Sequence, residues 1–169
     1  MAINAGKKFE LKVRSDLKKV PGISVDRLYD SVSGYKHISN ISDILFYRFP
    51  FICYGEIKSH KGNTFPIANL TQYDKLIEKK GIKGVRAGVI LWLIDHNHVI
   101  WIPIETFEKM KNDNVKSFNI KMLSDNPNNY KFYDIPSTLR RVFMDTDYNK
   151  LFEYWEKEFE ETSIWNFIK

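Results

Sequence analysis

Four apolar runs of strand length, arranged as two pairs with a short connection inside each pair, constrain the fold of this chain most. The first pair is residues 43–47 and 51–57, joined by residues 48–50; the second is residues 85–94 and 99–104, turning at residues 95–97. Apolar, aromatic-rich runs with such short connections are typical of antiparallel hairpins. Pro103 has no backbone donor, which indicates that the last strand lies at a sheet edge or is ending there. We therefore predict two antiparallel strand pairs.

Helical patterns precede, separate and follow these pairs. Phe9, Val13 and Leu17 recur every four residues within residues 5–19, and Pro21-Gly22 ends this predicted helix. Further helices are predicted at residues 70–80, at residues 104–111 and from residue 147 onward, a short strand at residues 23–29, and loops at residues 30–40 and 124–129. The order helix, hairpin, helix, hairpin indicates an α/β fold with a mixed central β-sheet flanked by helices.

Length and composition favour a single domain over residues 1–169 with a sizeable apolar core. Hydrophobic residues make up 43% of the 169, and no apolar run approaches the length of a membrane span. The N-terminus lacks the apolar core of a secretory signal, so a cytoplasmic protein is expected. The lone Cys53 excludes an internal disulfide and a cysteine-based zinc cluster, and we interpret it as a small apolar strand residue.

Charge is distributed unevenly along the chain. From Asp145 to the end there are three basic and seven acidic residues, so the remainder of this +5 chain carries about +9. A basic body suits a polyanionic partner such as nucleic acid, although many lysine-rich proteins bind none. The tail also holds five aromatic residues that would suit base stacking, but its acidity favours packing on the domain or on a second subunit: Tyr154, Trp155, Phe159, Trp165 and Phe167.

One constellation points to chemistry. Glu56 and Lys58 lie two residues apart on a predicted strand, so they project from the same face, and Asp43 opens the neighbouring strand. Two carboxylates with few nitrogen or sulfur ligands nearby suit a hard cation such as Mg²⁺ or Mn²⁺, which can activate water against a phosphodiester. Lys58 would orient or deprotonate that water, or neutralise charge on the phosphate. The alternative is an ordinary surface ion pair on a hairpin.

The segments around these residues resemble a known family. Residues 56–66 are similar to an E-x-K-S-x-K-G-x-S/T-x-P block, residues 84–90 with 101–105 to its paired core strands, and residues 6–10 to its opening helix. The sequence thus resembles the PD-(D/E)XK nuclease superfamily and, more narrowly, the RecU-type Holliday junction resolvases of Gram-positive bacteria and their phages. The resemblance covers about residues 5–110, and it implies a restriction-endonuclease-like core there, followed by an extension with an aromatic-rich helix at about residues 145–169.

The resemblance also implies roles for individual residues. Asp43 and Glu56 would be metal ligands together with the backbone carbonyl of Ile57, and Lys58 would be the catalytic lysine. Glu10 would approach the metal from the first helix, or be an exposed helix carboxylate. Gln72 resembles a family glutamine on the following helix, or is a solvated side chain, because its spacing from the preceding block is short.

DNA contacts and assembly complete the expectation. The candidates for phosphate binding are Lys7, Lys8, Arg27, Lys36, His60 and Lys61. For the lysines of the first helix, a merely solvated face is the alternative. The resemblance implies a homodimer, whose two-fold axis would suit symmetric cutting of paired strands.

Two departures from the family affect the substrate. Ser42 stands where the superfamily name implies proline, which many RecU-type members also lack. Residues 30–40 are shorter than the projecting stalk that the family associates with the junction centre. We therefore predict a Mg²⁺-dependent endonuclease acting on branched DNA, of the Holliday junction resolvase type. The alternatives are a nuclease of the same fold acting on duplex or flap DNA, and a catalytically silent DNA-binding module.

Overall fold

The computed structural model of the chain describes residues 5–28, 31–33, 36–38 and 40–167. Its helices are α1 (Ala5–Leu17), α2 (Tyr73–Ile77), α3 (Ile104–Asn112), α4 (Ile120–Asp125) and α5 (Tyr148–Phe167), with 3-10 turns η1 (Ile67–Asn69) and η2 (Ile94–His96). Its longer strands are β4 (Ile44–Arg48), β5 (Phe51–His60), β7 (Val85–Leu93) and β8 (His98–Pro103). The shorter strands are β1 (Ser24–Arg27), β2 (Ser31–Ser33), β3 (Lys36–Ile38), β6 (Phe65–Pro66), β9 (Ser117–Phe118), β10 (Tyr133–Ile135), β11 (Ser137–Arg140) and β12 (Phe143–Thr146).

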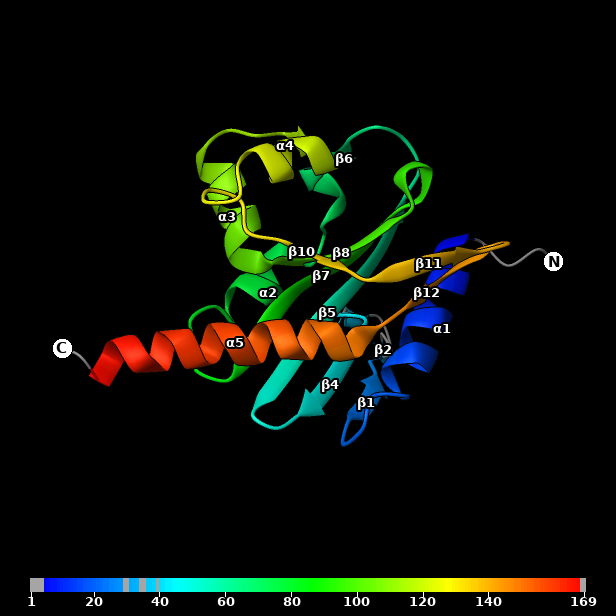
Figure 1. Cartoon of the computed structure of the whole chain (residues 1–169). Helices are drawn as coiled ribbons and strands as arrows, with labels where there is room; N and C mark the ends of the chain where they lie inside the picture. The colour runs from blue at the N-terminus through cyan, green and yellow to red at the C-terminus, as the bar shows by residue number, and fades with distance from the viewer. Residues whose placement is uncertain (1–4, 29–30, 34–35, 39, 168–169) are drawn as a thin grey trace.

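A six-stranded sheet in the order β1-β4-β5-β7-β8-β10 forms the centre of the molecule (Figure 1). Both predicted hairpins, β4–β5 and β7–β8, are antiparallel, whereas β5 and β7 run parallel. A parallel pair cannot be closed by a tight turn, so the chain needs the long crossover at residues 61–84, which contains α2. The mixed central sheet flanked by helices is confirmed.

The two faces of the sheet carry separate apolar cores. One face packs against α1 and α5, and its strand residues include Phe46, Cys53, Ile57 and Trp92. The other face packs against α2 and α3 and includes Val89 and other alternate residues of β7 and β8. This alternation follows from the two-residue period of a strand. Glu56 and Lys58 have the opposite parity to Cys53 and Ile57, which places them on the α2–α3 side.

The C-terminal helix is part of the main core. Trp155 is fully buried, and its ring centroid lies 5.2 Å from that of Trp101 and 6.1 Å from that of Phe46. The predicted stripe of Leu151, Trp155 and Phe159 faces the sheet, with the first two buried and the third partly buried. Packing on the domain, rather than on DNA bases, therefore accounts for Trp155. The side chains of Trp165 and Phe167 lie outside the described part of the chain.

Three local predictions need correction. Residues 30–40 were predicted to be a loop, but β2 and β3 pair there in an antiparallel ladder. The helix predicted at residues 70–80 is only the short α2, because η1 and turns occupy the rest of the crossover. The loop predicted at residues 124–129 begins later, because α4 continues to Asp125. Of the two interpretations of Pro103, the second is confirmed: Pro103 ends β8, which is not an edge strand because β10 pairs with it.

Candidate active site

The register of β4 and β5 brings Asp43 beside Glu56. Ile44 pairs with Gly55, so the next step along the antiparallel ladder places Asp43 across from Glu56. The backbone N–H of Ile57 donates to Asp43 Oδ2 at 2.8 Å, which fixes that carboxylate against β5. Asp43 therefore stands at the position that the hairpin pattern predicted, on the same side of the sheet as Glu56.

Glu56 is a buried carboxylate with incomplete compensation. Its side chain is 0% exposed, and its Oε1 lies 2.8 Å from Lys58 Nζ. Its Oε2 is enclosed without a hydrogen-bond partner among the described residues. Burial, reinforced by the negative charge of Asp43, raises the pKa of Glu56 to about 7, while the ammonium of Lys58 opposes the rise. A buried, half-satisfied carboxylate is costly, and such groups concentrate at functional sites.

A cavity of about 270 Å³ opens beside Asp43. Arg27 Nε lies 3.0 Å from Glu10 Oε1 at its wall, so the structure pairs the predicted phosphate-binding arginine with the predicted metal-proximal carboxylate. The cavity is lined by Glu10, Arg27, Leu28, Asn40, Ser42, Asp43 and Gln72. Three separate segments named by the sequence, on α1, at the start of β4 and before α2, thus converge on one place.

The donor set fits a hard divalent cation. Asp43 and Glu56 supply carboxylate oxygens, and the unpartnered Oε2 of Glu56 is a vacant acceptor. Within the described residues no group of three His, Cys, Asp or Glu side chains lies close enough to hold an ion together. Two carboxylates are sufficient for Mg²⁺, which commonly retains several waters and binds through one or two protein carboxylates. Glu10, engaged by Arg27, does not join Asp43 and Glu56 in such a group.

The remaining predicted DNA contacts are dispersed around the site. Lys7 and Lys8 are exposed on α1, and Lys61 is exposed just beyond β5. His60 packs edge-on against Phe65, with ring centroids 5.5 Å apart, so an aromatic neighbour orients it. The side chain of Lys36 lies outside the described residues.

Sequence reasoning missed two polar residues of the cavity, Asn40 and Ser42. Their closeness to Asp43 in the chain was the available signal. Ser42 is buried and its Oγ donates to the carbonyl oxygen of Ile44 at 3.0 Å, so it shapes the backbone beside Asp43. Ser42 thus orders the backbone at the start of β4 through a hydrogen bond.

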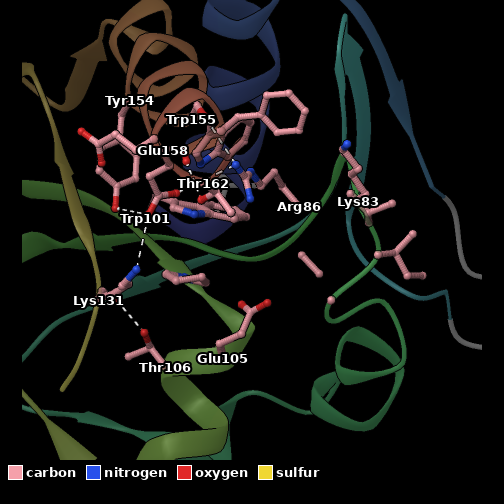
Figure 2. A pocket seen from close by; sticks show the side chains of 18 of the residues that line it. Lys83, Arg86, Trp101, Glu105, Thr106, Lys131, Tyr154, Trp155, Glu158 and Thr162 are labelled. Carbon is pink, nitrogen blue, oxygen red and sulfur yellow. Dashed lines mark hydrogen bonds and ion pairs between the residues drawn. The ribbon is translucent and has the colours of Figure 1, made fainter. Parts of the chain in front are cut away.

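A larger cavity, of about 720 Å³, lies away from this centre, between α5 and the start of β7 (Figure 2). Arg86 dominates its wall, donating to the carbonyl oxygen of Trp155 at 3.4 Å and lying 4.0 Å from Glu158. Glu158 also accepts from the Tyr154 hydroxyl and lies 3.8 Å from Lys131. Glu158 thus lies between two cations, Arg86 and Lys131, whereas Glu56 has one ammonium partner and a neighbouring carboxylate.

Comparison with known proteins establishes the fold. The chain matches no protein-family profile and no curated protein sequence. Its structure is similar to that of Hjc, a Holliday junction resolvase from the archaeal hyperthermophile Archaeoglobus fulgidus, with a TM-score of 0.51. The two share 19% sequence identity, over 69% of this chain and 90% of that one. None of the helices in the described ranges could cross a membrane. The chain therefore shares the restriction-endonuclease-like fold of this resolvase.

Proposed function

We propose that this chain is a Mg²⁺-dependent endonuclease, also able to use Mn²⁺, that hydrolyses phosphodiesters in branched DNA. The single observation that carries the proposal is the fully buried Glu56, held between Asp43 and Lys58 with one oxygen unpartnered. An ordinary surface ion pair, the alternative interpretation of these residues, would not enclose its carboxylate. The nuclease-like fold and the basic body of the chain support the same conclusion.

Asp43, Glu56 and the backbone carbonyl of Ile57 would hold the divalent ion. When bound, the ion supplies Lewis-acid activation of a phosphodiester and lowers the pKa of a coordinated water. Asp43 is pre-oriented by the N–H of Ile57, so little reorganisation is needed on binding. Lys58, whose Nζ lies 2.8 Å from Glu56 Oε1, would stabilise charge that develops on the phosphate.

A four-way junction is the proposed substrate, in recombination, repair or phage DNA processing. The structural likeness to an archaeal junction resolvase supports this choice, and so does the RecU-type block that follows Glu56. A RecU-type enzyme of phage or prophage character would act as a homodimer in the cytoplasm, cutting two strands symmetrically. The short β2–β3 ladder, in place of a long stalk, favours a second candidate: a nuclease of the same fold with duplex or flap DNA as substrate.

A cleavage assay with three substrates tests the proposal. Four-way junction, matched linear duplex and flap DNA are incubated with wild type, Asp43→Asn and the control Asp125→Asn, in Mg²⁺, in Mn²⁺ and in EDTA. Asp125 is an exposed aspartate at the end of α4, so its loss should be silent.

Symmetric, metal-dependent nicking of the junction alone, lost in Asp43→Asn and kept in Asp125→Asn, is the expected result. Equal cutting of all three substrates would select the second candidate. Binding without cutting by wild type would overturn both and identify a catalytically silent module.

A further inference from the structure

A projecting hairpin stands beside α1, built from β11 and β12 (Figure 1). Its base is anchored: Ser137 Oγ donates to Thr146 Oγ1 at 3.2 Å, and Asp145 pairs with Lys12 of α1 at 2.9 Å. Its tip, residues 139–143, extends beyond these anchors. Phe143 also contacts α1, since Lys12 Nζ lies 5.0 Å from its ring centroid, so the hairpin is held in place while much of its tip stays exposed.

The tip combines exposed apolar side chains with arginines. Leu139, Val142 and Phe143 are 49%, 72% and 40% exposed. Arg140 and Arg141 lie between them and are also exposed. Large apolar side chains clustered at an exposed tip are disfavoured unless something covers them. Arginines among them indicate an anionic partner that also presents apolar surface.

The tip lies at the end of the molecule where the catalytic strand ends. Val142 and Phe143 line a cavity of about 230 Å³ together with Lys8 and Trp92. Trp92 pairs with Ser59, the residue that follows Lys58 on β5. Trp92 belongs to the α1–α5 face, so the tip lies at the same end of β5 as Lys58 but on the opposite face of the sheet.

Charge around the tip is predominantly basic. Lys8 and Lys19 are exposed on α1 near the hairpin. The two carboxylates there are already engaged: Asp16 is buried between Lys12 and Lys19, and Asp145 pairs with Lys12 and, at 3.9 Å, with Arg140. Phosphate groups complement this surface, and unstacked bases complement the apolar side chains. A DNA branch point offers both.

We propose, on the basis of the nuclease function above, that the tip of the β11–β12 hairpin binds DNA at a branch point. Arg140 and Arg141 contact backbone phosphates, and Val142 and Phe143 pack against bases that are unstacked at the branch. The hairpin thus supplies a branch-reading contact at the end of the molecule where β5 ends, in a chain whose β2–β3 segment is short.

Binding without cleavage tests this contact. Junction and linear duplex are titrated in EDTA against wild type, Arg140→Ala/Arg141→Ala, Val142→Ser/Phe143→Ser and the control Lys150→Ala/Lys157→Ala, which removes two exposed charges from α5. The arginine pair should weaken junction binding about 10-fold or more and lower the salt slope by roughly 1 to 2. The apolar pair should weaken junction binding about 5-fold while leaving duplex binding unchanged.

A 2-aminopurine at the branch gives a second readout that does not depend on affinity. Wild type should raise its fluorescence by unstacking it, and Val142→Ser/Phe143→Ser should not, at saturating protein. Arg140→Lys/Arg141→Lys should retain most of the binding, and thermal denaturation should show all variants folded, because every altered side chain is exposed.

The possible outcomes distinguish a failure of the hairpin proposal from a failure of the proposed nuclease function. If the tip variants bind the junction as wild type does while Asp43→Asn abolishes its cutting, the proposed role of the hairpin is refuted and the proposed nuclease function stands. Tip variants that change only the molecular mass in light scattering would also overturn it, assigning the tip to contact between copies. A wild type that neither cuts nor binds branched DNA would refute the nuclease itself.

Discussion

Two buried carboxylates, Asp16 on α1 and Glu56 on β5, lie in opposite chemical situations. Asp16 is contacted by Lys12 at 2.5 Å and Lys19 at 2.7 Å, and the backbone N–H of Thr146 donates to it at 3.5 Å. Glu56 has one ammonium partner, a neighbouring negative charge from Asp43, and an oxygen with no hydrogen-bond partner among the described residues.

The difference teaches how to tell a structural charge from a functional one. Asp16 joins α1 to β12 through Lys12, which also pairs with Asp145, so its charge is balanced by the fold itself. The charge of Glu56 is left unbalanced in a way that a bound cation would complete. Burial alone would rank the two residues equally; the number and sign of their partners separates them.

Removing the ammonium at each place should have the largest and most contrasting effects. Lys58→Ala should lower the turnover number by about 1000-fold, since under the proposed function it removes the charge that would stabilise the reacting phosphate. Its stability should change little, because Glu56 can take up a proton. Initial cleavage rates in Mg²⁺ and thermal denaturation measure the two quantities.

Lys12→Ala is the matched control for Lys58→Ala. It should lower stability and leave the turnover number of the folded protein intact. A Lys12→Ala protein that is stable but inactive would contradict the assignment of a structural role to Lys12 and a catalytic role to Lys58.

Truncating the structural carboxylate should cost stability next. Asp16→Ala leaves two lysines without their shared partner and should lower the free energy of unfolding by about 3 kcal/mol. Urea denaturation measures this loss. Cleavage by the folded fraction should match wild type, and a loss below half a kilocalorie would show that Asp16 does not hold α1 to β12.

Glu56 should make the free energy of unfolding depend on pH. Its pKa is raised to about 7 by burial and by Asp43, so the native state favours the protonated acid. This contribution is fully present below the unfolded-state pKa and is lost as pH rises toward 7. Without divalent ions, Glu56→Gln should therefore be more stable than wild type at pH 8, by on the order of 2 kcal/mol.

Denaturation at pH 5 and pH 8, with and without Mg²⁺, checks this contribution. Added Mg²⁺ should stabilise wild type and not Glu56→Gln. If the free energy of unfolding depends on pH in the same way in both proteins, burial of the Glu56 carboxylate does not destabilise the fold.

The smallest effects should come from the cavity wall. Glu10→Gln and Gln72→Ala should each lower cleavage about 10-fold while changing stability by less than about 0.5 kcal/mol, because neither side chain is fully buried. Glu108→Gln, at a half-buried position of α3 that is ion-paired with Lys80, is the control. Wild-type rates in both cavity variants would reduce the site to Asp43, Glu56 and Lys58.

The strand pairs and the placement of Asp43, Glu56 and Lys58 were predictable because they depend on local rules. A two-residue period fixes which side chains share a face, and a short connection fixes the antiparallel neighbour. The convergence of Glu10 and Gln72 on Asp43 came only from the family resemblance, since it depends on how α1 and the crossover pack.

The β2–β3 ladder, the brevity of α2 and the pairing of Asp16 with Lys12 and Lys19 were missed. Ladders in polar segments carry little apolar periodicity, so the sequence pattern at residues 30–40 resembles a loop. The partners of a buried carboxylate are set by tertiary packing. Lys12 is four residues from Asp16, but nothing in the sequence shows that Asp16 is enclosed.

The position of α5 in the chain has a consequence for biosynthesis. Every strand of the central sheet precedes α5, yet Trp155 of that helix covers Phe46 and Trp101. A nascent chain therefore carries an uncovered aromatic surface until this helix has left the ribosome. A product truncated before Tyr148 would therefore keep this surface exposed and should aggregate more readily than the full chain.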